Sequence, residues 1–353
     1  MKKVIALLLA FTMVFALCAC GSSKTEASNE TAVNTETAEG SKFEPMTIQI
    51  GSANPSTDSD IFYVTVMETS KRLEEWTDGA VKLEYIGDGA TGNDSELAEG
   101  LKIGTLDGAI IVTSVFASSV PCVGLFDMPY VFENAEAVYD FVDNSDVIHT
   151  IYDKIEDQYN AKVIGWGHNG FRNTLNNVRP ITCAADFEGL KIRVMESPVY
   201  MELFSLLGAN PTPMAISECL TGLEQKTVDG MDHPVAASYN AGGYKLVKYF
   251  DLTQHTATEM ALCIRADLFE SFSPELQDLF YKAAAEAQIV AREKLASLED
   301  QMLSEIETYG TQVGRNIDVA SIREKLAPMY AEYRDSLDPE VFDAAMEYLG
   351  ITY

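Results

Sequence analysis

The alternation of extended and helical patterns constrains the fold of this chain most. Residues 47–50 and 81–86 are predicted strands, and apolar side chains recur at helical spacing between them, over about 60–76. After a polar loop, a helix that Ser95 is expected to cap leads to a third short strand at 107–112. Strand, helix, strand, helix, strand is typical of a parallel or mixed sheet covered by helices.

The same alternation returns in the second half of the chain. Strands are predicted at 162–166 and 190–194, and a helix with a serine cap and a first-turn proline begins at Ser197. A further helix begins at Ser217, and 227–231 leads into a strand or a loop. With 353 residues, the chain has room for two α/β domains of ordinary size.

One uninterrupted helical pattern follows these units in the sequence. It starts at Ser273-Pro274 and continues to about Tyr309, with no further Gly or Pro before Gly310. A helix of that length measures roughly 50 Å at about 1.5 Å per residue, which exceeds the width of one small domain. We therefore expect it to span both domains.

The charge of the chain excludes one class of partner. Asp and Glu number 54 against 25 Lys and Arg, which gives a net charge of −29. A surface this acidic is repelled by phosphate backbones, so no nucleic-acid binding is expected.

The N-terminus has the features of an export signal. Lys2 and Lys3 precede an apolar stretch that is long enough for a signal peptide but short for a membrane span. Small residues before Cys20 resemble the bacterial lipobox, which predicts a signal peptide over 1–19 and an acylated (palmitate-bearing) Cys20. A plain secretory peptide and acylation at Cys18 are the alternatives.

The segment that follows is predicted to be a tether. Ser, Thr, Glu, Ala and Asn dominate residues 21–42, so the segment cannot bury enough apolar area to offset its ordering entropy. With the lipid anchor, residues 20–43 would hold a folded body near a membrane, with a reach of roughly 25 Å.

Neither the cysteines nor the histidines form a pattern that indicates chemistry. The cysteines after the tether match no zinc or CxxC spacing, so separate thiols or a disulfide both remain open: Cys122, Cys183, Cys219 and Cys263. The four histidines form no HxxxH or HxH pair, and no GxSxG or Walker sequence is present. We expect no enzyme, no cofactor and no metal.

An ordered series of motifs carries a family resemblance. The motifs are Thr-Gly-Asn-Asp-Ser-Glu-Leu (91–97), Gly-Thr-Leu-Asp (104–107), Phe-Asp-Met-Pro-Tyr-Val-Phe (126–132), Gly-Phe-Arg-Asn-Thr (170–174), Arg-Pro-Ile (179–181), Asp-Phe-Glu-Gly-Leu-Lys-Ile-Arg-Val (186–194), Ser-Pro-Val-Tyr (197–200), Leu-Gly-Ala-Asn-Pro-Thr-Pro-Met-Ala (207–215) and Thr-Val-Asp-Gly-Met-Asp-His-Pro (227–234). In this order they resemble the DctP-type solute-binding proteins of tripartite ATP-independent periplasmic (TRAP) transporters, over nearly the whole body from about residue 47.

The resemblance implies an α/β, two-lobed fold of the periplasmic-binding-protein type II, with mixed sheets flanked by helices. Lobe I would hold 44–168 plus about 259–298, and lobe II would hold 169–258 plus about 299–353. The lipobox-like sequence predicts that this protein is anchored by lipid on the outer face of the cell membrane, and nothing in the sequence demands more than a monomer. This receptor would close on a small carboxylate and deliver it to TRAP membrane subunits.

Two arginines are implied to bind that carboxylate. Arg193 stands where the family clamps the ligand, and Arg172 stands where a second cationic contact is common. A planar guanidinium offers two parallel N–H donors that match a carboxylate, which a lysine cannot reproduce. Without the motifs, a surface salt bridge would be the better interpretation of Arg193, and Arg172 can instead pair with an acidic neighbour.

Other candidate positions are less specific. Asp232-His233 stands where the family usually has Glu-Asn, and His233 is expected to contact ligand or solvent, with a charge that varies near neutral pH. Glu196 replaces the Asn of sialate-binding members, so it disfavours sialate and a second acidic group, and it suits a ligand hydroxyl or ammonium. Asn54 and Asp94 lie in loops after strands, where ligand contacts and ordinary turn chemistry are both common.

The ligand and the biological context remain open at this stage. C4-dicarboxylates, hydroxy acids and sugar acids all fit these residues. The alternatives in function are a receptor for an ABC importer and a ligand sensor without transport. An adhesin or structural lipoprotein would explain the tether but not the motif series.

Overall fold

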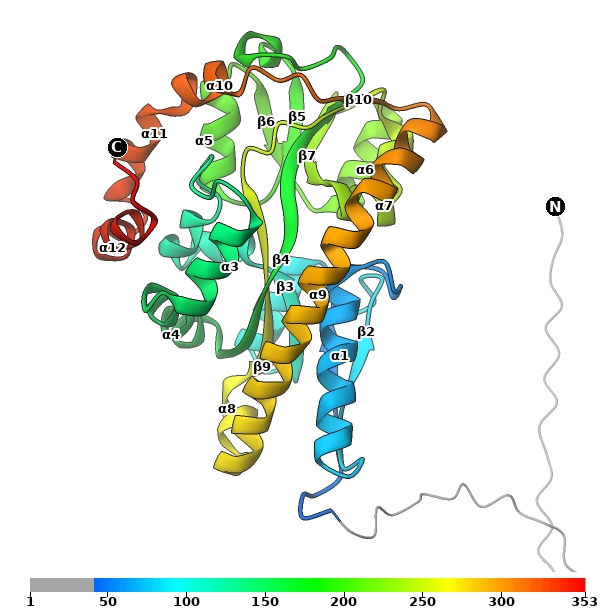
Figure 1. Ribbon diagram of the computed structural model, residues 1–353, viewed down its shortest axis with the longest axis vertical. Coiled ribbons are helices and arrows are strands. Elements are labelled where there is room, and N and C mark those ends of the chain that lie inside the picture. The colour runs from blue at the N-terminus through cyan, green and yellow to red at the C-terminus, as the bar shows by residue number, and fades with distance from the viewer. Residues whose placement is uncertain (1–40, 353) are drawn as a thin grey trace, which may run out of the picture. The chain divides into compact units, whose positions relative to one another are not determined.

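The computed structural model describes residues 41–352, and these form a ten-stranded mixed sheet with helices on its faces (Figure 1). The predicted signal peptide, Cys20 and nearly all of the predicted tether lie outside the described residues. The strands are β1 (Met46–Gly51), β2 (Val81–Ile86), β3 (Gly108–Val112), β4 (Ala161–Asn176), β5 (Lys191–Val194), β6 (Asn210–Pro213), β7 (Gly230–Pro234), β8 (Tyr249–Asp251), β9 (Ala257–Arg265) and β10 (Gln312–Gly314).

The α-helices cover this sheet, and short 3-10 turns connect several elements. The helices are α1 (Ile61–Trp76), α2 (Asp94–Lys102), α3 (Ala135–Asn144), α4 (Val147–Tyr159), α5 (Pro198–Leu206), α6 (Ile216–Gln225), α7 (Val235–Asn240), α8 (Ala266–Glu270), α9 (Pro274–Tyr309), α10 (Val319–Leu326), α11 (Pro328–Arg334) and α12 (Pro339–Leu349). Within the described residues, no helix is both long and apolar enough to cross a membrane.

The first part of the sheet confirms the predicted alternation β1, α1, β2, α2, β3. Strands β2, β1 and β3 run parallel, and β9 joins β3 in the antiparallel sense. The cap of α2 is Asn93 and not Ser95, because the Asn93 side chain accepts from the Glu96 N–H while the Glu96 side chain accepts from the Asn93 N–H. This reciprocal capping box satisfies two backbone donors at the start of the helix, which a cap at Ser95, two residues later, would leave open.

The second part of the sheet is built from β4, β7, β5 and β6, with β8 beside β4. The predicted strand at 190–194 and the helices after Ser197 and near Ser217 are confirmed as β5, α5 and α6. Ser197 precedes α5, but its side chain makes no capping hydrogen bond, which corrects the expected cap.

Strand β4 connects the two parts of the sheet and is much longer than the predicted 162–166. Its residues 161–171 pair with β9, and residues 172–176 pair with β7. Glycines hide the strand from pattern reading, since they break the apolar alternation. They allow close packing: a Cβ on Gly167 would lie 2.5 Å from the end of the Met260 side chain, and one on Gly165 would lie 2.9 Å from the end of the Gln288 side chain in α9.

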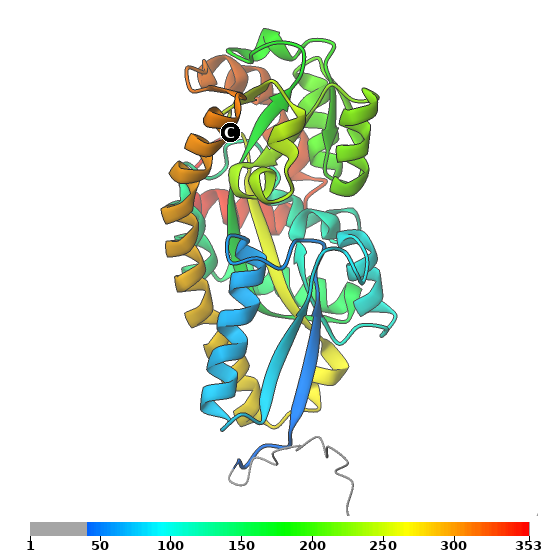
Figure 2. The ribbon, with the colours of Figure 1, turned by 90° about the vertical axis from the view of Figure 1, so that its right-hand side faces the viewer.

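Helix α9 confirms the long predicted helix, with 36 residues. It begins after Ser273, whose side chain accepts from the Leu276 N–H, and ends at Gly310 in the left-handed region (φ 115°). Figure 2 shows α9 running along both parts of the sheet.

The C-terminal helix α12 returns to the first part of the molecule. Tyr348 of α12 donates to the Asp140 carboxylate in α3 (3.0 Å), and Lys154 of α4 pairs with Asp338 just before α12 (2.9 Å). The lobe boundaries given above stay a prediction, and this packing places α12 beside helices that the prediction assigns to lobe I.

Candidate ligand-binding site

A cavity of about 40 Å³ lies where loops from the first part of the sheet face the interior of β4 and the ends of β5 and β7. It has room for about three water molecules. Its polar lining includes six of the seven predicted site residues, which are Asn54, Asp94, Arg172, Arg193, Glu196 and His233, together with Asn169 and Thr258. Its apolar lining includes Phe62, Val112, Val115, Met195 and Ile216.

Arg193, on β5, brings a buried guanidinium with a free donor to this cavity. The side chain is 2% exposed, which excludes a surface salt bridge. Its Nε donates to the Met214 carbonyl (2.8 Å) and its Nη2 to the Met195 sulfur (3.4 Å). Nη1 is buried and has no hydrogen-bond partner among residues 41–352. Burial lowers the pKa of Arg193, yet a guanidinium stays charged in proteins.

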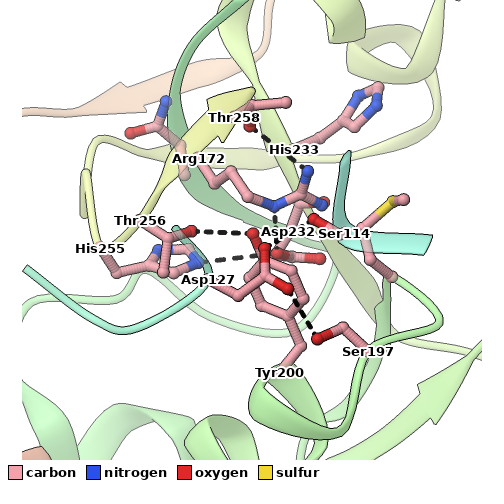
Figure 3. A network of polar contacts seen from close by, with 12 residues as sticks. Ser114, Asp127, Arg172, Ser197, Tyr200, Asp232, His233, His255, Thr256 and Thr258 are labelled. Carbon is pink, nitrogen blue, oxygen red and sulfur yellow. Dashed lines mark hydrogen bonds and ion pairs between the residues drawn. The ribbon is translucent and has the colours of Figure 1, made fainter. Parts of the chain in front are cut away.

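Arg172, on β4, is also buried but is fully engaged by the protein (Figure 3). Its Nε donates to Asp232 Oδ2 (2.5 Å) and its Nη2 to the Asp232 carbonyl (2.7 Å). The guanidinium also lies over the Tyr200 ring, 5.0 Å from the centroid. Nη1 donates a long hydrogen bond to Thr258 Oγ1 (3.5 Å), and both residues line the cavity.

Asp232 is the one predicted site residue that does not line the cavity. It lies behind Arg172, completely buried, on β7. Burial alone would raise the pKa of Asp232, but the charge and hydrogen bonds of Arg172 outweigh it and hold that pKa well below its usual range. Asp232 therefore acts on the cavity through Arg172.

His233 lines the cavity as a neutral ring. Its Nδ1 lies 3.0 Å from the Ser238 hydroxyl. Burial, together with the positive charges of Arg172 and Arg193, lowers the pKa of His233 well below its ordinary value. The expectation of a charge that varies near neutral pH is therefore wrong, because desolvation and both cations act in the same direction.

The first part of the molecule contributes one buried amide and one carboxylate. Asn54 Nδ2 is buried and has no hydrogen-bond partner in the described part of the chain. Asp94 opens helix α2 and accepts from the Val112 N–H at the end of β3 (3.1 Å). Burial raises the pKa of Asp94 to about 6.

Glu196 contacts the opposite side of the cavity directly. Its Oε2 accepts a hydrogen bond from the Ser95 hydroxyl of α2 (2.7 Å). Glu196 follows β5 and Ser95 belongs to the first part of the sheet, so this bond joins the two sides.

A second bridge beneath the cavity was missed in the sequence. Asp127 accepts from the Ser114 hydroxyl and from the Ser197 hydroxyl, at 2.6 Å each (Figure 3). This contact explains why Ser197 does not cap α5. Burial raises the pKa of Asp127 to about 6, although both hydroxyls favour its charged form. Asp127 lies within the Phe-Asp-Met-Pro motif, which was the available signal.

The arrangement suits the recognition of a carboxylate. A buried guanidinium N–H and a buried amide N–H have no partners among the described residues, so both are able to donate to the acceptors of a guest. Among residues 41–352, no group of three or more His, Cys, Asp or Glu side chains is placed to hold a metal ion. The four cysteines of the described region are free thiols.

Comparisons with known proteins agree with this geometry. The family model for bacterial extracellular solute-binding proteins, family 7 (DctP), matches residues 52–336. The 2,3-diketo-L-gulonate-binding periplasmic protein YiaO of Escherichia coli K12 is 28% identical over 285 residues, which are 79% of this chain and 84% of YiaO.

Solved structures give the same result for the fold. A TRAP periplasmic solute-binding protein from Polaromonas sp. JS666, bound to D-erythronate, has a TM-score of 0.80 and 27% identity, covering 85% of this chain and 97% of that one. The sugar acid binding protein DctPAm from Advenella mimigardefordensis, in complex with galactonate, has a TM-score of 0.80 and 28% identity, covering 86% and 99%. These neighbours confirm the predicted two-lobed α/β fold.

The site geometry, the family match over most of the chain and the structural neighbours lead to one conclusion: the chain belongs to the DctP family, family 7 of the bacterial extracellular solute-binding proteins.

Proposed function

We propose that this receptor binds a small hydroxylated carboxylate, a sugar acid or related hydroxy acid, and delivers it to TRAP membrane subunits. The single observation that carries the proposal is the buried Nη1 of Arg193, a residue that lines the cavity, because this atom has no hydrogen-bond partner in the described part of the chain. A carboxylate matches this charged donor better than any neutral group.

Hydroxyl groups on the ligand would occupy the remaining polar lining. Asn54 offers a free amide donor, while Asp94 and Glu196 offer carboxylate oxygens. Similar solved proteins carry D-erythronate and galactonate, which combine one carboxylate with several hydroxyls. These ligands support the same class for this chain.

Binding would proceed by separation and closure of the two sides. A cavity of about 40 Å³ is too small for a four- to six-carbon acid, so the sides must move apart to admit one. The ligand would then stabilise a closed form by contacts with both sides at once. We place the moving parts as the predicted lobes, 44–168 with about 259–298 and 169–258 with the C-terminal remainder.

The lipid anchor is a separate part of the proposal. Acylation of Cys20 would hold this receptor at the outer face of the membrane as a monomer, beside its TRAP subunits. Metabolic labelling with a radioactive or alkyne fatty acid tests it: the wild-type chain should carry label in the membrane fraction, and Cys20→Ser should be unlabelled. A labelled Cys20→Ser variant would refute acylation at this cysteine.

A thermal-shift panel tests the ligand class. The panel should contain aldonates, uronates, hydroxy acids, C4-dicarboxylates and the matching neutral sugars, because a ligand that binds only the folded state raises its stability by mass action. We expect stabilisation by hydroxylated acids and none by neutral sugars. Stabilisation by neutral sugars or amino acids alone would contradict the proposal and favour a receptor of the ABC-importer type.

A further inference from the structure

The charges that line the cavity do not balance. Two guanidinium groups, Arg172 and Arg193, and two carboxylates, Asp94 and Glu196, line the same small space. Arg172 is already neutralised by Asp232. In residues 41–352, neither cavity carboxylate forms an ion pair with a cation, and Arg193 forms none with an acid. Besides the paired Arg172, the wall therefore holds one guanidinium and two carboxylates that form no direct ion pair, although Asp94 and Arg193 lie close enough to attract each other.

Both carboxylates are held in place by bonds that use only one of their oxygens. Glu196 Oε2 accepts from Ser95, across the cavity, and Asp94 Oδ1 accepts from the Val112 N–H. The second oxygen of each has no hydrogen-bond partner among the described residues. A fixed carboxylate with a free oxygen accepts a hydrogen bond from a ligand hydroxyl and repels a ligand carboxylate.

We propose that Asp94 and Glu196 form a charge filter that makes this receptor selective for monocarboxylate polyols and rejects the corresponding dicarboxylates. The filter rests on the proposed function, since it assumes that Arg193 takes one carboxylate of a hydroxylated acid. One ligand carboxylate compensates Arg193. A second would enter a space that holds no further unpaired cation within residues 41–352 and would meet two like charges there, the partly buried Asp94 and the solvent-exposed Glu196.

Such a charge filter would separate this chain from a receptor for C4-dicarboxylates. Such a ligand needs a cation for each end, and here the second arginine is already paired within the protein. The carboxylates come from opposite sides, Asp94 from α2 and Glu196 from the segment after β5, so the filter is complete only when both sides meet around the ligand.

Matched ligand pairs test the filter. Galactonate ends in a hydroxymethyl group where galactarate carries a second carboxylate, and the two acids are otherwise identical. D-Erythronate and meso-tartrate differ in the same way. Calorimetry at pH 7.5 with the full mature chain should show a preference of at least about 100-fold for the monoacid of whichever pair binds. Glu196→Gln and Asp94→Asn, which keep the acceptors for Ser95 and Val112, should each reduce that preference about tenfold.

A charge control excludes an effect of the general acidic field. Glu224→Gln removes one negative charge from the exposed surface of α6, away from the cavity, and should leave the preference unchanged. The filter is overturned if the wild-type chain binds the diacid as tightly as the monoacid, or if both cavity variants keep the full preference. If no member of either pair and no other hydroxy acid binds, the proposed function itself fails, and the filter fails with it.

Discussion

The surroundings of Arg172 and Arg193 differ more than their shared burial suggests. Both side chains are at most 2% exposed and both line the same cavity. Arg172 has a carboxylate, a carbonyl and an aromatic face as partners within the protein. Arg193 has one carbonyl and one sulfur, and its Nη1 has no partner among residues 41–352.

This contrast assigns different tasks to the two arginines. A buried charge that is paired belongs to the fold, because removing either partner leaves the other uncompensated. A buried charge that is not paired weakens the free protein and is maintained for a guest. Arg172 should therefore control stability first, and Arg193 should control affinity.

The largest effect is expected at the paired arginine. Asp232→Ala removes the carboxylate that neutralises Arg172, and we expect the free energy of unfolding to fall by about 3–5 kcal/mol. Denaturant titration at pH 7.5 measures this loss. The double variant Arg172→Met with Asp232→Leu, which leaves no unpaired charge, should recover part of it. A loss below about 1 kcal/mol in the single variant would mean that the pair is dispensable.

The unpaired arginine should show the opposite behaviour. Arg193→Ala should weaken binding of the preferred acid by roughly 10- to 150-fold, which corresponds to about 1.5–3 kcal/mol for a charged hydrogen bond. The free energy of unfolding of the ligand-free protein should not fall. Calorimetry and denaturant titration measure the two quantities. Arg315→Ala, which removes a half-exposed arginine of a surface ion pair, is the matched control and should leave affinity unchanged.

Burial also changes the charge of an acidic side chain, as Asp60 shows. Burial raises the pKa of Asp60 to about 7, despite its hydrogen bonds from the N–H groups of Phe62 and Tyr63 and from Asn240, and Asp88 adds repulsion. The folded carboxyl therefore holds a proton that the unfolded one, with an ordinary pKa of 3.8, has released. The resulting stability is present at low pH and is lost as pH rises through about 7.

We therefore expect the free energy of unfolding to be about 1–2 kcal/mol higher at pH 5.5 than at pH 7.5 because of Asp60. Asp60→Asn retains a good cap for α1 and should flatten this dependence. Asp94 and Asp127, each with a pKa raised to about 6, leave a smaller slope of the same sign in that variant. Thermal melts across this range measure the slope, and an unchanged slope in Asp60→Asn would show that Asp60 is ionised in the folded state.

The smallest effect concerns the neutral counterpart of Arg193. Asn54→Ala removes a buried amide donor that has no partner in the described chain, and we expect a loss of affinity of about 0.5–1.5 kcal/mol, typical of a neutral hydrogen bond. Calorimetry with the preferred acid measures it. A loss as large as that of Arg193→Ala would mean that Asn54, and not Arg193, is the main anchor.

Local sequence patterns predicted those helices and strands whose bounds depend on neighbouring residues in the chain. Helix α9 and the alternation β1, α1, β2, α2, β3 follow from apolar spacing and capping residues. The prediction for strand β4 was too short because the glycines of this strand, against which Met260 and Gln288 pack closely, interrupt that spacing. The bounds of β4 therefore depend on partners far away in the sequence.

In the site, too, local motifs predicted some residues, whereas contacts between distant residues had no signal in the sequence. The motifs placed Arg193, Arg172 and His233 at the cavity, because each lies at the end of a strand or within one. The pairing of Arg172 with Asp232 joins residues 60 positions apart, and the bridge of Asp127 to Ser197 joins residues 70 apart, so neither has a local signature. The charge state of His233 depends on the same distant neighbours.

A crystal structure with the preferred monoacid bound tests the central claim most directly. The measured quantity is the distance from Arg193 Nη1 to the nearest carboxylate oxygen of the ligand. We predict about 2.7–2.9 Å, the range of charged hydrogen bonds, with the Arg172–Asp232 pair intact. A ligand whose carboxylate lies elsewhere, with Arg193 Nη1 still without a partner, would contradict the account.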